Sequence, residues 1–207
     1  MLHFISNPIK LFVTITFLMC LFYLNRKTLV DKLLCTILFV YFITELLNEI
    51  LVFNHISIGL SYNVSSLIQF SFWFFIISRT FNINFYKIIL PYLIPSLYLI
   101  NQNIDNFNKN SFVLGSFIYM IIYLVESYKR LKLEKIEFFK SNGFFLISCP
   151  IIFFLGLSLM FAFNSKSLTS TIIFGNTKLY TFITLAVNII YYTLINVYIY
   201  KERKLNA

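Results

Sequence analysis

Two glutamates stand four residues apart inside an otherwise apolar stretch of the chain. The stretch reads ITELLNEILVFN, and a helix there places Glu45 and Glu49 on one face with Asn48 beside them. Carboxylates are expensive in lipid, so each one found within a membrane segment marks a candidate site. Neighbouring carboxylates repel each other, and such a pair would share a proton or bind a cation or an amine. The pattern therefore predicts proton or cation chemistry around Glu45.

Polar side chains in two other apolar stretches can complete this site. Asn63 and Gln69 lie in the first half of one stretch, and Asn188 lies in the middle of the last one. We predict a polar pocket whose lining is Glu45, Asn48, Glu49, Asn63, Gln69 and Asn188. The alternative is that these groups form hydrogen bonds between helices, each worth ~0.6 kcal/mol, and only hold the helices together.

The elements that must position these residues are long apolar runs. Hydrophobic residues make up 59% of the 207-residue chain, charged residues make up 12%, and the mean hydropathy is +0.80. A water-soluble core of this size cannot bury so much apolar surface, and continuous apolar runs in lipid must be helical. We predict an all-α polytopic membrane protein, a single domain over residues 1–207, with seven transmembrane helices at about 7–24, 33–53, 61–79, 85–101, 111–128, 143–163 and 178–200.

The span at 85–101 is the weakest of the seven. It is short and contains Pro91 and Pro95, which free backbone carbonyls and kink a helix. Whether this span crosses the membrane completely stays open at this point. Trp73 and tyrosines near span ends are expected to act as interfacial anchors.

The basic residues of the chain predict its orientation. Of 17 Lys and Arg residues, only Lys10, Lys109, Lys166 and Lys178 fall on one side of the predicted spans. The positive-inside rule then places the N-terminus outside and the C-terminus in the cytoplasm. It also explains the net charge of +9 without nucleic-acid binding, because no loop is long enough to form a soluble basic surface.

The expected partners follow from the same charge distribution. Membrane lipids surround the helices, and anionic head groups attract the basic loops. The loop at 129–142 is the most basic, and we expect an irregular cytoplasmic segment there that can contact a cytoplasmic or membrane protein partner.

Catalytic and metal-binding patterns are missing from the sequence. Cys20, Cys35 and Cys149 lie in apolar runs without metal-ligand spacing, and His3 and His55 both fall outside the middle of a span. This argues against a haem held by two imidazoles and against a zinc-dependent membrane protease. We expect no cofactor, no metal and no catalytic residue.

The arrangement resembles a group of small, uncharacterised bacterial membrane proteins of seven helices, similar to the membrane-sensor halves of histidine kinases. Beyond the seven runs, the resemblance rests on Asn48-Glu49, on Tyr62-Asn63 and on the aromatic run from Phe70 to Phe75. It implies a bacterial cytoplasmic (inner) membrane and a sensor-like role. We expect no output domain attached to the seven spans, so signalling would require a separate partner.

Three functions stay open at this stage. The first is a non-enzymatic sensor-like or accessory module with a polar pocket in the outer half of the bundle. The second is a small-solute or proton-coupled transporter or channel, in which Glu45 would carry the proton. The third is a membrane-embedded lipid-modifying enzyme, for which the sequence offers no convergent nucleophile and base.

Overall fold

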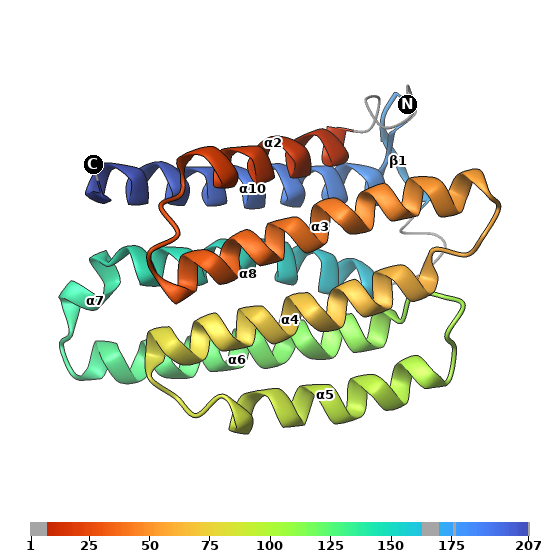
Figure 1. Cartoon of the computed structure of the whole chain (residues 1–207). Coiled ribbons are helices and arrows are strands. Elements are labelled where there is room, and N and C mark those ends of the chain that lie inside the picture. The colour runs from red at the N-terminus through yellow and green to blue at the C-terminus, as the bar shows by residue number, and fades with distance from the viewer. Residues whose placement is uncertain (1–7, 163–169, 176, 207) are drawn as a thin grey trace.

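The protein is an all-α bundle with one small β-hairpin (Figure 1). A computed structural model describes residues 8–162, 170–175 and 177–206. The helices and strands, in chain order, are α2 (Pro8–Tyr23), α3 (Leu29–Phe53), α4 (Gly59–Phe81), α5 (Tyr86–Asn101), α6 (Lys109–Lys132), α7 (Ile136–Lys140), α8 (Asn142–Ala162), β1 (Ile172–Phe174), β2 (Thr177–Lys178) and α10 (Leu179–Asn206). The all-α prediction is confirmed.

Five helices in the described part of the chain are long and apolar enough to cross a membrane: α3, α4, α6, α8 and α10. The other two predicted spans correspond to α2 and α5, and each of these helices has 16 residues. At 1.5 Å per residue such a helix is about 24 Å long, which is shorter than the ~30 Å hydrocarbon core. Pro91 and Pro95 both lie inside helix α5.

The chain connections alternate between the two ends of the bundle (Figure 1). One end holds the start of α2, the α3–α4 and α5–α6 connections and the β-hairpin; we call it the hairpin end. The opposite end holds the α2–α3 and α4–α5 connections, α7 and the C-terminal end of α10; we call it the α7 end. Helices α2 and α3 pack together, α10 packs on α2 and α8, and α6 packs on α5 and α8.

Two connections differ from the sequence predictions. The irregular segment expected at 129–142 is partly helical, because α6 continues to Lys132 and α7 forms a further short turn. Arg130 organises this segment, since its guanidinium donates to the Phe81 carbonyl oxygen at 2.7 Å and lies 4.6 Å from the centre of the Phe138 ring. Residues 172–174 and 177 lie between the last two predicted spans, and Lys178 was predicted to begin the last span. In the structure β1 and β2 pair as antiparallel strands, and α10 begins at Leu179. The predicted positions 7 and 163 lie outside the described residues.

Aromatic rings fill the middle of the bundle. Phe70 on α4 stacks on Phe154 of α8 with centroids 4.7 Å apart, and Tyr119 on α6 lies 5.1 Å from the same Phe154 ring. Trp73 belongs to this core with an exposed fraction of 0%. The prediction that Trp73 anchors the protein at the membrane interface is therefore wrong, because its position on α4 faces Tyr119 and Tyr191.

A buried carboxylate ties α3 to the last helix near the α7 end. Asp31 is 1% exposed and caps the first turn of α3 together with Thr28, whose hydroxyl donates to Asp31 at 2.6 Å. The Tyr198 hydroxyl of α10 donates to the other Asp31 oxygen at 2.9 Å. Together these two hydrogen bonds stabilise the carboxylate and join helices far apart in sequence.

We expect Tyr198→Phe to lower the free energy of unfolding by roughly 1.5–3 kcal/mol, the usual range for a hydrogen bond to a charged group. Thermal unfolding of the purified protein in detergent measures the change. Tyr200→Phe is the matched control, because Tyr200 lies on the same helix and is 53% exposed. Equal unfolding temperatures for the two variants would contradict the assigned role of Tyr198.

Candidate functional site

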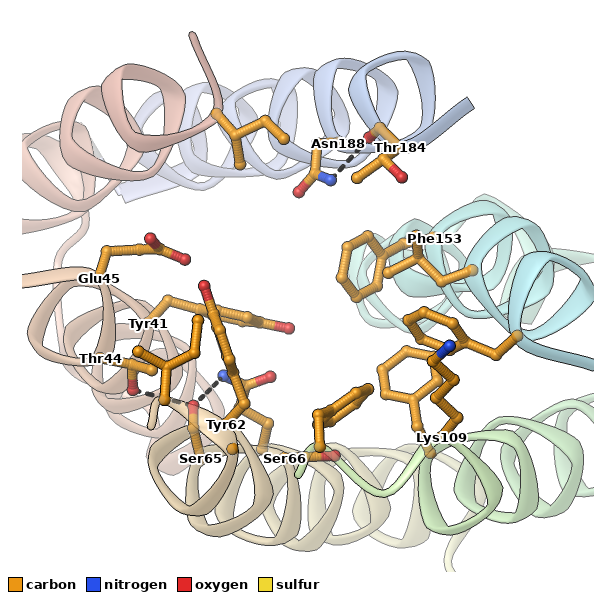
Figure 2. Close-up of a pocket in the computed structure, with 18 of the residues that line it drawn as sticks. Tyr41, Thr44, Glu45, Tyr62, Ser65, Ser66, Lys109, Phe153, Thr184 and Asn188 are labelled. Atoms are coloured by element: carbon orange, nitrogen blue, oxygen red, sulfur yellow. Dashed lines mark hydrogen bonds between the residues drawn. The ribbon is translucent and has the colours of Figure 1, made fainter. Parts of the chain in front are cut away.

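A cavity of about 490 Å³ opens between α3, α4, α8 and α10 in the half of the bundle nearest the hairpin end (Figure 2). Its rim includes Ser57 from the α3–α4 connection and Asp105 and Asn106 from the α5–α6 connection, all of which are exposed. Gln69 lies ten residues into α4, so the cavity reaches roughly 15 Å along the helices at 1.5 Å per residue.

Three residues of the predicted pocket line this cavity: Glu45 of α3, Gln69 of α4 and Asn188 of α10. The structure thus brings together side chains of two consecutive helices, α3 and α4, and of α10, which lies far from both in sequence. The remaining three, Asn48, Glu49 and Asn63, have other environments and are not part of the lining.

Glu49 forms an ion pair with Lys10 of α2. The two charges neutralise each other. The sequence predicted that Glu45 and Glu49 act together in one site, but the two side chains lie in different environments. Glu45 faces the cavity, and Glu49 connects α3 to α2. Asn48 is 2% exposed, and neither its side-chain nitrogen nor its oxygen has a hydrogen-bond partner among the described residues.

Asn63 binds the backbone of the α5–α6 connection. Its side-chain amide donates to the Asn106 carbonyl oxygen at 3.0 Å, and its oxygen accepts from the Asn108 backbone N–H at 2.8 Å. The side chain is 1% exposed. Asn63 therefore positions the rim of the cavity and does not face its interior.

Polar side chains of α3 and α4 form one wall of the cavity (Figure 2). The hydroxyls of Thr44 and Ser65 lie 2.9 Å apart, and the Gln69 amide donates to Ser65 at 2.7 Å. On α10, the Asn188 amide donates to the Thr184 carbonyl oxygen at 2.7 Å. Each of these two side-chain amides is thus held by a hydrogen bond to a residue of its own helix that also lines the cavity.

Glu45 is partly buried at one side of the cavity, and the Tyr62 hydroxyl points toward it (Figure 2). Its electrostatic partners come from three neighbouring helices: Lys10 of α2, Tyr62 of α4 and Tyr192 of α10. The only acid that acts on it from its own helix is Glu49, whose charge Lys10 balances. Of the two glutamates, Glu45 is therefore the one available to a molecule inside the cavity, while Asp105 adds a carboxylate at the exposed rim.

Aromatic and aliphatic side chains line the opposite wall, where Phe153 of α8 lies across the cavity from Glu45 (Figure 2). The other apolar lining residues near this wall are Phe107, Phe112, Leu157 and Phe161. The cavity therefore has a polar side with a carboxylate and an apolar side, which is the usual composition of a small-molecule site.

The site prediction omitted several lining residues, and helical spacing contains the signal for some of them. Tyr41 precedes Glu45 by four residues, and Tyr192 follows Asn188 by four residues. Residues four apart share a helix face, so a pocket that contains Glu45 and Asn188 is expected to contain these two tyrosines as well. Lys109 and Asp105 carry no such signal, because the fold of the α5–α6 connection brings them to the rim.

The lining residues limit which groups the cavity can hold. Within residues 8–162, 170–175 and 177–206, no group of three His, Cys, Asp or Glu side chains has an arrangement that could hold a metal ion. Glu45 has a tyrosine neighbour, and the second carboxylate of the lining, Asp105, belongs to the exposed rim. A single carboxylate surrounded by hydroxyl, amide and aromatic groups can hold a proton or a positively charged group.

No family model, curated protein or solved structure matches this chain.

Proposed function

We propose that the protein is a seven-span receptor-like membrane protein that binds a small organic molecule in the Glu45 cavity, without chemical change, and relays occupancy to a partner. The observation that carries this proposal is a cavity of about 490 Å³ that contains a carboxylate and opens at one end of the bundle. Volumes of about 300–1,000 Å³ are typical of small-molecule sites.

In this proposal α2 and α5 span the membrane together with the five longer helices, and the hairpin end faces the outside. The support is the distribution of charge, because the connections and helix ends at the α7 end together carry most of the Lys and Arg residues. By the positive-inside rule that end is cytoplasmic, and the membrane is the bacterial inner membrane. The cavity then opens away from the cytoplasm.

The proposed partner contact is the segment 129–142 at the α7 end. It combines exposed apolar side chains, Leu131, Leu133 and Ile136, with the charged residues of the same segment. Helix α8 connects the two regions, since Phe153 lines the cavity and Asn142 begins the helix directly after α7. A ligand that shifts α8 would therefore move the segment that the partner contacts.

Blocking the cavity is expected to abolish ligand binding and to leave the fold intact. Thr184 lines the cavity, so Thr184→Phe fills it, whereas Thr181 is exposed on the same helix and Thr181→Phe is the matched control. Trp73 supplies the readout as the only tryptophan. Its ring lies 6.5 Å from Tyr191, which stacks at 4.9 Å on Phe153 in the cavity wall.

A screen of small organic molecules against the purified protein should yield saturable changes in Trp73 fluorescence. These changes should disappear in Thr184→Phe and persist in Thr181→Phe. Ligands that bind both variants equally would show that the cavity is not the site, and the proposal would fail.

A proton-coupled transporter is the second proposal, and the cavity position of Glu45 favours it. One helical turn beyond Gln69 and Asn188, however, Trp73 and Tyr191 are fully buried and in ring contact. This packed layer supports binding over passage. Uptake of a bound compound into proteoliposomes, lost in Glu45→Gln, would favour transport over the receptor-like function.

A further inference from the structure

We infer that the ligand of the cavity is an organic ammonium ion, a small molecule with a positively charged nitrogen attached to an apolar body. This inference rests on the proposed binding function and specifies its ligand. Three independent properties of the cavity support it: its charge balance, the aromatic rings beside Glu45 and the separation of its polar and apolar walls.

The charge balance of the lining favours a monovalent cation. The lining includes two carboxylates, Glu45 and Asp105, and one ammonium group, Lys109, among the described residues. Lys10 and Glu49 form a neutral ion pair next to the cavity and leave this balance unchanged. One bound positive charge therefore neutralises the lining, whereas an anion would increase the imbalance.

Within the cavity, the positive charge belongs beside Glu45. Lys109 lies on the other side of the cavity (Figure 2), so a cation at that side would meet a like charge. Beside Glu45 lie Tyr41 and Tyr62, with Tyr192 completing the aromatic surroundings. Aromatic rings attract ammonium groups through their quadrupoles, by about 0.5–2 kcal/mol for each well-placed ring.

The lining also offers a hydrogen-bond acceptor on α10 to a ligand that carries N–H groups. The Thr184 hydroxyl is buried and has no hydrogen-bond partner among the described residues. It lines the cavity one helical turn from Asn188. A buried hydroxyl without a partner is costly, and a bound donor would satisfy it.

The size and the apolar wall exclude a bare metal cation as the natural occupant. A cavity of about 490 Å³ corresponds to roughly 16 water molecules at ~30 Å³ each. Phe153, Phe112 and Leu157 form the wall opposite Glu45, and they offer no ligand to a hydrated ion. An apolar body of the ligand would fill this side and remove these side chains from water.

A probe series of matched shape tests the inference on the unmodified protein. Phenethylamine is positively charged at neutral pH, phenethyl alcohol is neutral and phenylacetate is negatively charged, while all three share the same ring and a similar length. We expect phenethylamine to bind saturably, phenethyl alcohol to bind at least about tenfold more weakly, a difference of ~1.4 kcal/mol, and phenylacetate not to bind. Trp73 fluorescence and isothermal titration calorimetry measure the three affinities.

Substitution of Glu45 tests whether its carboxylate causes the preference for the positively charged probe. Glu45→Gln should reduce the affinity for phenethylamine about tenfold and leave phenethyl alcohol unchanged, while Glu45→Asp should retain most of the preference. Glu126→Gln is the control, because Glu126 pairs with Lys129 on a helix surface outside the lining.

The inference is overturned if phenethylamine binds no more tightly than phenethyl alcohol to the unmodified protein, or if Glu45→Gln leaves their ratio unchanged. Failure of the proposed function looks different, since binding of every compound would then be insensitive to Thr184→Phe. The comparison among probes needs no variant, so it holds even where a substitution prevents folding.

Discussion

Gly59→Ala is expected to detach the first turn of α4 from the α5–α6 connection and to lower the free energy of unfolding by roughly 1–3 kcal/mol or more, the range for overpacked sites. A Cβ atom at position 59 would lie 2.2 Å from the Asp105 carbonyl oxygen and 2.6 Å from the Asn106 Cα atom. Both are backbone atoms, which cannot rotate away as a side chain can. The connection itself must therefore move.

The displacement should also impair binding, because Gly59, Asp105 and Asn106 all belong to the rim of the cavity. Gly143→Ala is the matched control. Gly143 lies in the first turn of α8, and its added Cβ would make only an ordinary contact, 3.7 Å from Thr80 Cγ2. Thermal unfolding and ligand titration of the two variants measure the effect, and a Gly59→Ala protein as stable as Gly143→Ala would refute the close approach.

Asn63→Leu is expected to have a comparable effect by a different mechanism. Leucine has a similar volume, but it can form neither the 3.0 Å hydrogen bond to the Asn106 carbonyl oxygen nor the 2.8 Å one from the Asn108 N–H. Leaving a buried polar group without a partner costs about 1–3 kcal/mol, and two groups of the same connection lose theirs. We expect a lower unfolding temperature and weaker ligand binding.

Asn103→Leu is the control for Asn63→Leu, since Asn103 lies in the same connection but is exposed. Combining Gly59→Ala with Asn63→Leu adds a stricter test. Both act on one contact between α4 and the connection, so their effects on unfolding should be less than additive. Full additivity would mean that the two residues hold separate parts of the structure.

The sequence predicted the helices well because a single apolar segment in lipid can satisfy all its backbone hydrogen bonds only as a helix. It also placed Glu45, Gln69 and Asn188 in one half of the bundle, and these three residues line the cavity. The ion pair of Glu49 could not be predicted, because its partner Lys10 lies 39 residues earlier on another helix. Sequence spacing contains no information on such a pairing.

Asn63 and Trp73 illustrate the same limit in different ways. Asn63 was predicted to face the pocket, but it binds backbone atoms of a connection 43 to 45 residues away. Tryptophan is a residue type typical of interfacial anchors, and only the packing of α4 against its neighbours places Trp73 in the core. Residue type limits what a side chain can do, whereas tertiary contacts decide which of these roles it takes.

The pairing of α2 with α10 has a consequence for how the protein is made. Helix α2 leaves the ribosome well before α10, yet each packs extensively on the other, and the Asn196 amide donates to the buried Thr16 hydroxyl at 3.1 Å. At about 5–20 residues per second of translation, α2 waits for roughly 10 seconds or longer before its final neighbour exists. During synthesis its inward face must be covered by lipid, by the insertion machinery or by α3 alone. Helix α10 thus completes the packing of α2, and a ribosome that stops before α10 releases a chain in which α2 lacks its main partner.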